Sequence, residues 1–359
     1  MVLRDSTNDW ATQEPAHHVL NPSARVLWRA PEEIQLELGQ RAVVLDGMNQ
    51  RGVRRLLGAA DPPRRAAQAP PIESVDPPGL GPALDELAGA GFLWNPTHDP
   101  APSLPPRLAP DVAAAQLRHG RRGREVLAAR ARCSVSVLGR GRVAGAVSGL
   151  LAAAGIGRVS FTDRGDVLLR TAMPGAASPQ DEGQPFTEVM GAALRRIAPE
   201  VDTTPLATDA RPDLVVLAPD VPVEPGLRER LHRDGRPHLL ADAGGDHVIV
   251  GPLVLPGLTS CLRCADLHRI DRDPAWSALA VQLSIAPRGP RPSDVVLASL
   301  CASLAALQAL TFLDGDEPAV LAGTVELRLP DWRLRRRSWP ARAECDCGAA
   351  GARSQRWAQ

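Results

Sequence analysis

Apolar and polar positions in the first hundred residues alternate over short runs, which is typical of strands. Three such runs lie at residues 24–28, 34–38 and 42–45. Residues 49–57 and 84–90 instead space their apolar positions as amphipathic helices do. We therefore expect a small antiparallel sheet with two helices, an α+β module over residues 16–94.

From residue 133 onward, short apolar strands alternate with helical patterns. Strands are predicted at residues 133–139, 158–163, 214–218, 238–241, 247–250 and 324–329. Helices are predicted at residues 111–130, 143–154, 186–197, 225–232 and 293–313. Alternation of this kind is typical of βαβ units, so it predicts an α/β fold with a mostly parallel, doubly wound sheet.

A proline-rich segment separates the two patterns. Residues 95–110 contain six prolines in sixteen positions, which predicts a linker. We expect the polar residues 1–15 to be a disordered N-terminus and residues 351–359 to be a tail. The α/β domain then spans residues 111–350.

Composition narrows the chemistry. The 359 residues are 44% hydrophobic and 23% charged, which is ordinary for a globular chain of two or three domains. The 41 basic and 41 acidic side chains balance, so no net charge favours nucleic acid or an anionic membrane. Every basic residue is arginine, because the sequence has no lysine. Schiff-base catalysis and a Walker-type lysine are therefore excluded.

The sequence also bears on the cellular compartment. A membrane helix needs an apolar run of roughly 18 residues, and we expect no run of that length and therefore no membrane helix. The N-terminus lacks the apolar core of a signal peptide, so we expect a cytoplasmic protein. Its six cysteines should then be mostly reduced, which makes clustered cysteines candidates for metal binding or catalysis.

A glycine turn lies between one predicted strand and the helix after it. Its pattern is G-x-G-x-x-A with two flanking arginines, and an aspartate ends the following strand. Such a turn brings backbone amides to a pyrophosphate at a helix N-terminus, and such a carboxylate binds ribose hydroxyls. The alternative is that the small residues serve only the turn and close helix packing, with solvated arginines. The candidate nucleotide-binding residues are Gly139, Gly141, Ala144, Asp163, Arg140 and Arg142.

Four of the cysteines form two close pairs, one C-x-x-C and one C-x-C. Each short spacer brings two sulfurs to one side of a turn, so together the pairs can hold a tetrahedral zinc ion. The predicted ligands are Cys261, Cys264, Cys345 and Cys347. The alternative is that these are reduced cysteines without a metal. Cys133 and Cys301 lie in apolar segments and are interpreted as core residues.

Longer segments resemble a known superfamily. The stretch SVSVLGRGRVAGAVSGLLAAAGIGRVSFTD, then DLVVLAPD, then GPLVLPGLTSCLRC resemble the ThiF/E1-like adenylyltransferases. The segments CLRCADLHRIDRDPAW and RRRSWPARAECDCGA resemble the E1-like, leader-peptide-binding proteins that accompany cyclodehydratases in thiazole/oxazole-modified microcin (TOMM) biosynthesis. The resemblance covers most of residues 16–350.

This resemblance implies a Rossmann-like E1 domain with a zinc-knuckle C-terminal region, preceded by a small winged-helix module that recognises a precursor peptide. In such modules a leader peptide adds to the small sheet as an extra strand. Residues 42–45 and the helix at residues 84–90 would form the walls of that groove. An ordinary small core is equally compatible with the residues alone. The resemblance also implies a possible homodimer.

Departures from the superfamily pattern fall on its ATP site. Active members have a G-x-G-G-x-G loop, an arginine and a lysine on the phosphates, and a later aspartate that binds magnesium. Gly139, Gly141 and Asp163 match, and Asp220 takes the later aspartate position, as the catalytic residue if adenylation is retained. Arg142 replaces a glycine, and the lysine is missing. Because charge stabilisation dominates such catalysis, these departures argue against independent ATP/Mg adenylation.

We therefore expect an E1-like partner protein of peptide natural-product (bacteriocin/TOMM) biosynthesis with a structural zinc. It would bind the leader of a ribosomal precursor peptide and present the peptide to a YcaO-type cyclodehydratase, itself acting as a non-catalytic component. Two alternatives stay open. One is an ATP-dependent adenylyltransferase that activates a carboxylate, and the other is a regulatory or structural protein that retains only the E1 fold.

Overall fold

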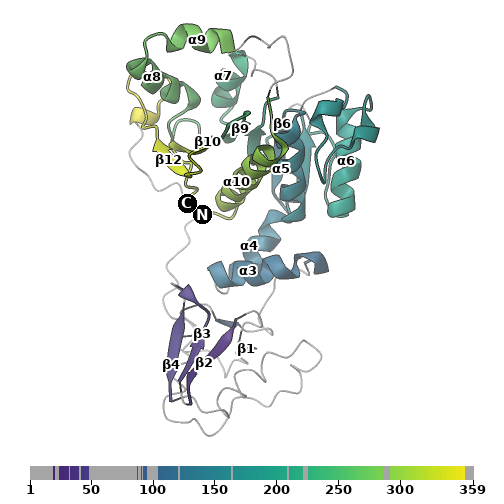
Figure 1. Cartoon of the computed structure of the whole chain (residues 1–359), viewed down its shortest axis with the longest axis vertical. Helices are drawn as coiled ribbons and strands as arrows, with labels where there is room; N and C mark the ends of the chain where they lie inside the picture. Colours follow the sequence, from purple (N-terminus) through teal and green to yellow (C-terminus); the bar gives the residue numbers. More distant parts are fainter. Residues whose placement is uncertain are drawn as a thin grey trace. The chain divides into compact units, whose positions relative to one another are not determined.

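The computed structural model describes residues 19–20, 24–31, 33–39, 42–47, 87, 90, 92–94, 104–119, 122–162, 165–207, 210–220, 225–283, 285 and 292–351. The chain forms two compact units, Met1–Ala129 and Arg130–Gln359. Figure 1 draws the described elements of both units. The expected tails at residues 1–15 and 351–359 lie outside the described residues, except for Gly351, which ends a 3-10 turn.

The first unit contains the predicted three-stranded antiparallel sheet. Its strands, in the order β2-β3-β4, are β2 (Val26–Ala30), β3 (Glu33–Leu36) and β4 (Val43–Asp46). A second pair joins β1 (Val19–Leu20) to β5 (Leu93–Trp94). The apolar positions that alternate in sequence fill one core, with Leu20, Ile34, Leu36, Val43, Leu45, Leu87 and Phe92 buried together. The three strand predictions are therefore confirmed.

The helical predictions for this unit have mixed outcomes. The helix expected at residues 49–57 lies outside the described residues. Of residues 84–90 only two are described, Leu87 in a helix and Ala90 in a turn. The helix predicted over residues 111–130 is wrong as one element, because it is two, α3 (Ala109–His119) and α4 (Gly123–Arg130). The 3-10 turn η5 (Pro106–Leu108) precedes α3, so the end of the predicted linker is helical. Helix α3 belongs to the same compact unit as the small sheet, whereas the sequence predicts that the α/β domain begins at residue 111.

The second unit is built on a seven-stranded sheet in the order β12-β11-β10-β9-β8-β6-β7. The strands are β6 (Ser134–Leu138), β7 (Arg158–Phe161), β8 (Leu214–Leu217), β9 (His238–Ala243), β10 (His247–Val254), β11 (Gly323–Arg328) and β12 (Arg335–Ser338). Four strands, β7, β6, β8 and β9, are parallel, and the pairings from β9 to β12 are antiparallel. The expectation of a mostly parallel sheet is therefore wrong for half of it. The cause is the short turn between β9 and β10, because so few residues can join only antiparallel strands.

Helices cover both faces of this sheet (Figure 1). They are α5 (Arg142–Ala153), α6 (Phe186–Ile197), α7 (Pro225–Arg233), α8 (Leu262–Arg272), α9 (Trp276–Leu283) and α10 (Val295–Leu313). Side chains of α5, α6 and α10 share the main core with one face. On the other face, Leu231 of α7 and Leu262 of α8 pack against Val215 and Leu217. This α/β/α layering confirms the Rossmann-like fold class.

Helix α10 is an apolar run of the length that the sequence was expected to lack. Its 19 residues are long and apolar enough to cross a membrane by length and composition. The large unit buries nearly half of its most apolar stretch, and Ala298, Cys301, Ala302 and Ala305 are wholly inside the core. Its small residues bring it close to α5, which it crosses in Figure 1. The apolar length of α10 therefore matches a position in the core.

Candidate functional site

Two segments far apart in sequence bring four cysteine sulfurs together. The Sγ atoms of Cys261, Cys264, Cys345 and Cys347 all lie within 4.8 Å of one another. The Sγ of Cys261 is 3.9 Å from that of Cys264 and 3.6 Å from that of Cys345, and the sulfurs of Cys264 and Cys347 are 3.6 Å apart. Four sulfurs at about 2.3 Å from a zinc ion form a tetrahedron with edges of about 3.8 Å. The cluster therefore has the size of a zinc site.

The local structure explains this convergence. Cys261 is the N-cap of α8 and Cys264 lies in its first turn, so one helical turn aligns their sulfurs. The C-terminal segment returns to α8 through the buried Trp339, close to the ring of His268. The Nε2 of His268 lies 2.9 Å from the Pro340 carbonyl oxygen, so this histidine holds the segment and is no fifth ligand.

Burial favours the neutral form of two of the clustered thiols. Burial raises the pKa of Cys261, and it raises the pKa of Cys345 to about 11. Desolvation also acts on Cys264, but backbone and thiol hydrogen bonds outweigh it and lower the pKa of Cys264. All four cysteines are free of disulfides. A zinc ion would turn these thiols into thiolates and tie the C-terminal segment to α8, which is a structural and not a catalytic role.

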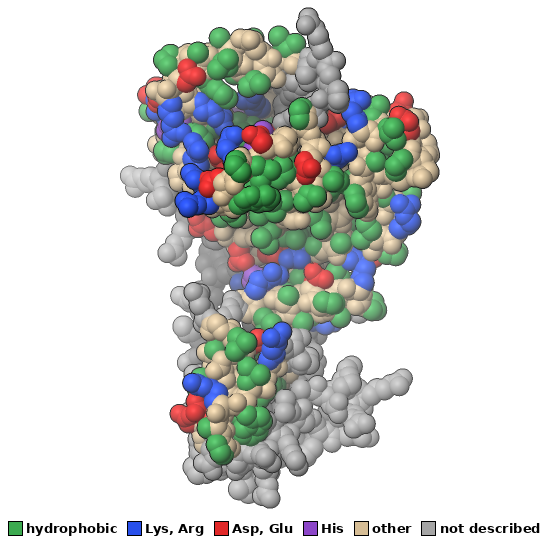
Figure 2. Space-filling view, in the orientation of Figure 1, with side chains coloured by type: hydrophobic (Ala, Val, Ile, Leu, Met, Phe, Trp, Pro, Cys, Tyr) green, Lys and Arg blue, Asp and Glu red, His purple; other side chains and the backbone are tan. Residues whose placement is uncertain are grey.

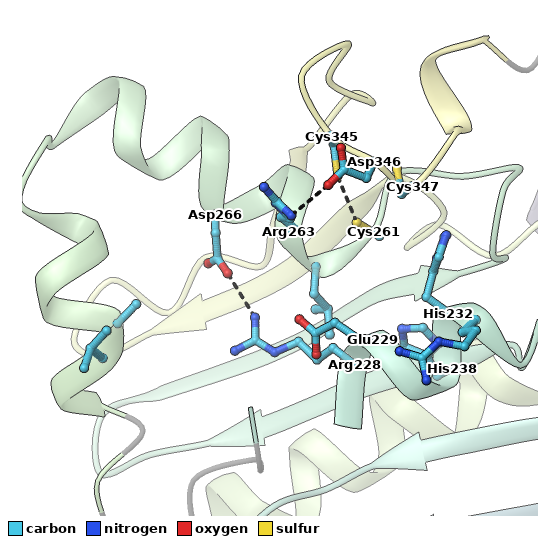
Figure 3. Close-up of a pocket in the computed structure, with 14 residues that line it drawn as sticks. Arg228, Glu229, His232, His238, Cys261, Arg263, Asp266, Cys345, Asp346 and Cys347 are labelled. Atoms are coloured by element: carbon cyan, nitrogen blue, oxygen red, sulfur yellow. Dashed lines mark hydrogen bonds and ion pairs between the residues drawn. The ribbon is translucent and has the colours of Figure 1, made fainter. Parts of the chain in front are cut away.

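A cavity of about 630 Å³ lies beside the cluster (Figure 3). It is lined by residues of α7, α8 and α9, and by Cys261, Cys345 and Cys347. Arg228 donates to Asp266 across it at 3.0 Å, and the ring of His238 forms part of its wall. Burial lowers the pKa of His238, which keeps that imidazole neutral near pH 7. Three of the four clustered cysteines therefore contribute to the wall of this cavity.

The glycine turn has the predicted strand and helix on either side of it. Gly139 adopts a φ of +125°, and a Cβ there would overlap the Ala218 carbonyl oxygen at the end of β8. A Cβ at Gly141 would lie 2.7 Å from the Cβ of Asp220. Ala144 is fully buried in the main core. These three residues are therefore explained by close packing, without a nucleotide.

The polar groups of the turn are only partly available to a ligand. The Arg140 backbone N–H donates to Asp220 Oδ1 at 3.1 Å, so the predicted magnesium ligand caps the turn. The Arg142 guanidinium donates to the Ser293 carbonyl oxygen at 2.6 Å. The Nε atoms of both arginines are buried and have no hydrogen-bond partner among the described residues. Asp163 lies outside the described residues, so its ribose contact stays a prediction.

The described walls of this turn leave little room. They enclose about 50 Å³, enough for a few water molecules, whereas ligand pockets usually measure about 300–1,000 Å³. The sequence did not point to three further residues of this cleft, Arg170, Thr171 and Ser293. They come from distant segments that carry no motif. The described part of this cleft is therefore too small for a nucleoside triphosphate.

Comparisons with known proteins agree with this architecture. None of the curated proteins matches the chain. Among solved structures, E. coli MccB with AMPCPP and MccA matches with a TM-score of 0.69 and 17% identity, over 92% of this chain and 99% of that one. The microcin C7 biosynthetic enzyme MccB with N-formylated MccA gives 0.66 and 17%, with the same coverage. PaaA gives 0.64 and 16%, over 89% of this chain and 99% of that one.

The comparison with protein families covers most of the second unit and both cysteine pairs. The ThiF family matches residues 114–349, nearly two thirds of the chain. The matched residues include the glycine turn, the mixed sheet and the four clustered cysteines. The chain therefore belongs to the ThiF family.

Proposed function

We propose that this chain binds the leader of a ribosomal precursor peptide on its N-terminal sheet and presents the peptide to a YcaO-type cyclodehydratase. The observation that carries the proposal is the open edge of β4. Among the described strands, β3 is the one that pairs with β4. Within the described residues the other edge of β4 has no strand partner, so an extended peptide could pair with its backbone N–H and C=O groups.

The two edges of the small sheet differ, and β4 is the better receptor. Residues 43–46 pair with β3 in unbroken register, and buried Val43 and Leu45 alternate with exposed positions. On the opposite edge, β2 has an irregularity between Trp28 and Ala30. Bulges of this kind twist an edge strand and block further pairing. A leader peptide on β4 would meet a regular strand held by a buried core.

The fold supports a peptide partner. A match over 92% of this chain includes most of both compact units, so it extends beyond the ThiF domain. The relative with that match, MccB, is crystallised with the precursor peptide MccA. Because the match covers most of the N-terminal unit as well, it is compatible with precursor recognition by that unit here.

The glycine turn supports the proposal that a separate enzyme carries out the ATP-dependent step. Asp220 caps the turn, Arg142 is bound to a backbone carbonyl, and the cleft is small. Without a lysine, the chain also lacks one of the charges that adenylation uses. The ATP-dependent step is therefore assigned to a separate cyclodehydratase.

The experiment measures binding of a fluorescent precursor peptide, encoded beside the gene for this chain, to the full-length protein. Val44 of β4 and Leu27 of β2 make a matched pair, because they lie on one face of the sheet with 36% and 37% exposure. Val44→Asp should weaken binding about tenfold, or about 1.4 kcal/mol, whereas Leu27→Asp should change it little. Equal effects of both variants, or no binding by the unmodified chain, would overturn the proposal.

A second candidate function is adenylation of a carboxylate. The two buried arginine Nε atoms without a partner favour it, because an anion at the turn would satisfy both. ATP–pyrophosphate exchange separates the two functions. Exchange that requires the precursor peptide, disappears in Asp220→Ala and survives in the surface variant Asp234→Ala would establish the enzyme. Absence of exchange under conditions of tight peptide binding favours the partner protein.

A further inference from the structure

The last strand of the large sheet, β12, is an exposed edge strand made of arginine. Its residues Arg335, Arg336, Arg337 and Ser338 are all exposed. Among the described strands, only β11 pairs with it. The sequence run RRRS gives no strand signal, because it lacks apolar alternation. As far as the described residues show, its outer edge therefore presents unpaired backbone groups beside a row of positive charges.

The surroundings of β12 carry an excess of positive charge in a chain that is neutral overall. Residues 328–342 contain six arginines and one acidic residue, Asp331. Figure 2 shows blue side chains on the side of the molecule where Figure 1 places β12 and α8. This concentration is local, since 41 basic residues balance 41 acidic ones over the whole sequence.

Contacts within the unit neutralise this charge only in part. Arg333 and Arg335 share the single carboxylate of Asp331. Arg337 Nε lies 3.4 Å from the buried carboxylate of Glu326. Arg272 lies over the Trp339 ring at 5.3 Å, and the described residues offer it no carboxylate. At least two guanidinium groups are therefore left for an external anion.

The register of β12 sets the pattern that a matching strand needs. Arg335 pairs with Glu326, Arg336 with Val325 and Arg337 with Thr324. Because successive side chains point to opposite faces of a sheet, Arg335 and Arg337 share a face and Arg336 lies on the other. An incoming strand with carboxylates at every second position would place them beside Arg335 and Arg337.

We infer that the outer edge of β12 binds an extended acidic segment of a partner protein as an eighth strand of the sheet. Backbone pairing would supply the register, and the arginines would select for carboxylates. This surface belongs to the second unit and is independent of the leader-binding edge of β4. Edge strands also carry charges simply to prevent self-association, and that simpler explanation is one outcome of the test.

The test uses a fluorescein-labelled (Glu-Val)4 octapeptide and the full-length chain at low salt. We expect saturable binding that weakens about tenfold in Arg333→Glu/Arg335→Glu. The control Arg195→Glu/Arg196→Glu changes the net charge equally at the exposed end of α6 and should keep the affinity. Neither Arg333 nor Arg335 contacts a buried carboxylate, so both double variants should fold. A (Lys-Val)4 peptide should not bind.

Hydrogen exchange distinguishes strand addition from simple charge attraction. The acidic peptide should slow amide exchange within residues 335–338, whereas an octathymidylate probe should not. The inference would be overturned if the oligonucleotide bound as tightly as the acidic peptide and neither protected the amides of residues 335–338. That result would show that β12 attracts anions in general. Absence of peptide binding, together with self-association of the Arg333→Glu/Arg335→Glu protein, would show that the arginines only protect the edge.

Discussion

Arg130, at the start of the large unit, makes its strongest buried contact with Asp314. Its Nε and Nη2 atoms lie 2.7 and 2.6 Å from the two carboxylate oxygens, and both side chains are at most 5% exposed. Arg130 Nη1 also donates to the carbonyl oxygen of Ala154 at 3.1 Å. One guanidinium group therefore joins the C-terminal ends of α5 and α10.

Removing one charge of this pair should be costly. Asp314→Asn should lower the free energy of unfolding by about 3–5 kcal/mol, because it leaves a buried guanidinium without its counter-ion. The double replacement Arg130→Met/Asp314→Leu should cost much less, since neither charge then needs solvation. Urea unfolding at neutral pH measures both variants. A cost below about 0.5 kcal/mol for Asp314→Asn would mean that the pair is exposed in solution.

His247 links stability to pH. Its Nε2 is 3.5 Å from Asp242, its Nδ1 is 2.8 Å from Asp246, and these carboxylates raise the pKa of His247 above its ordinary value. Stability from this histidine is therefore fully present below about pH 6.5 and is lost as the pH rises through the raised pKa. His247→Gln should destabilise the protein more at about pH 5.5 than at about pH 8.5. An equal effect at both pH values, in thermal unfolding, would contradict this assignment.

Single residues also show what a sequence can and cannot disclose. The short spacing within each cysteine pair predicted two candidate ligands. Because a zinc ion needs four, the two pairs were predicted to meet although they lie 84 positions apart. The contact of Arg142 with the Ser293 carbonyl joins residues 151 positions apart, and no motif marks Ser293. The arginines could therefore be identified as candidates, but not whether they were free to bind phosphate.

Among the elements, the glycine turn and α5 explain why the nucleotide motif allowed two interpretations. Gly139 is needed because β8 passes so close that a Cβ would meet the Ala218 carbonyl. Packing alone therefore preserves the pattern, whether or not a nucleotide binds. The sequence predicted the strand, the turn and the helix, but the same residues serve both roles.

A pair of alanine substitutions isolates this packing. Gly139 and Gly183 both have positive φ angles, but nothing lies within 4 Å of a Cβ at Gly183. Both substitutions strain the backbone. In Gly139→Ala, steric overlap should lower the free energy of unfolding by about a further 1–3 kcal/mol. Denaturant unfolding should therefore find Gly139→Ala less stable than Gly183→Ala. Equal stabilities would mean that the turn moves away from β8 without cost.

The knuckle formed by α8 and the C-terminal segment makes a prediction about metal content. Purified protein should contain about one zinc ion per chain, and Cys345→Ser should lose it with a fall in Tm of roughly 10 °C. Cys301→Ser is the control, because Cys301 is buried in α10 and is not in the cluster. Elemental analysis and thermal unfolding measure both properties. A metal-free wild type with an unchanged Tm after chelation would exclude a structural zinc.

For the whole molecule, the order of strands and helices followed from hydrophobic periodicity, and the layers followed from that order. The mixed sheet did not, because alternating strands and helices predict parallel pairing, whereas the short β9–β10 and β11–β12 connections join antiparallel strands. Strand β12 was not predicted, because its run of arginines lacks apolar alternation. Helix α10 shows the same difficulty in reverse, since a core position and a membrane span select similar side chains.

The central claim is that the chain recognises the leader of a precursor peptide and leaves the ATP-dependent step to another protein. Calorimetric titration of the full-length chain with the complete precursor, its leader half and its core half tests this claim most directly. We predict that leader and complete precursor bind with Kd values within about twofold of each other, that the core half does not bind, and that ATP with magnesium changes neither value. Binding by the core half without the leader, or binding only when ATP is present, would contradict the account.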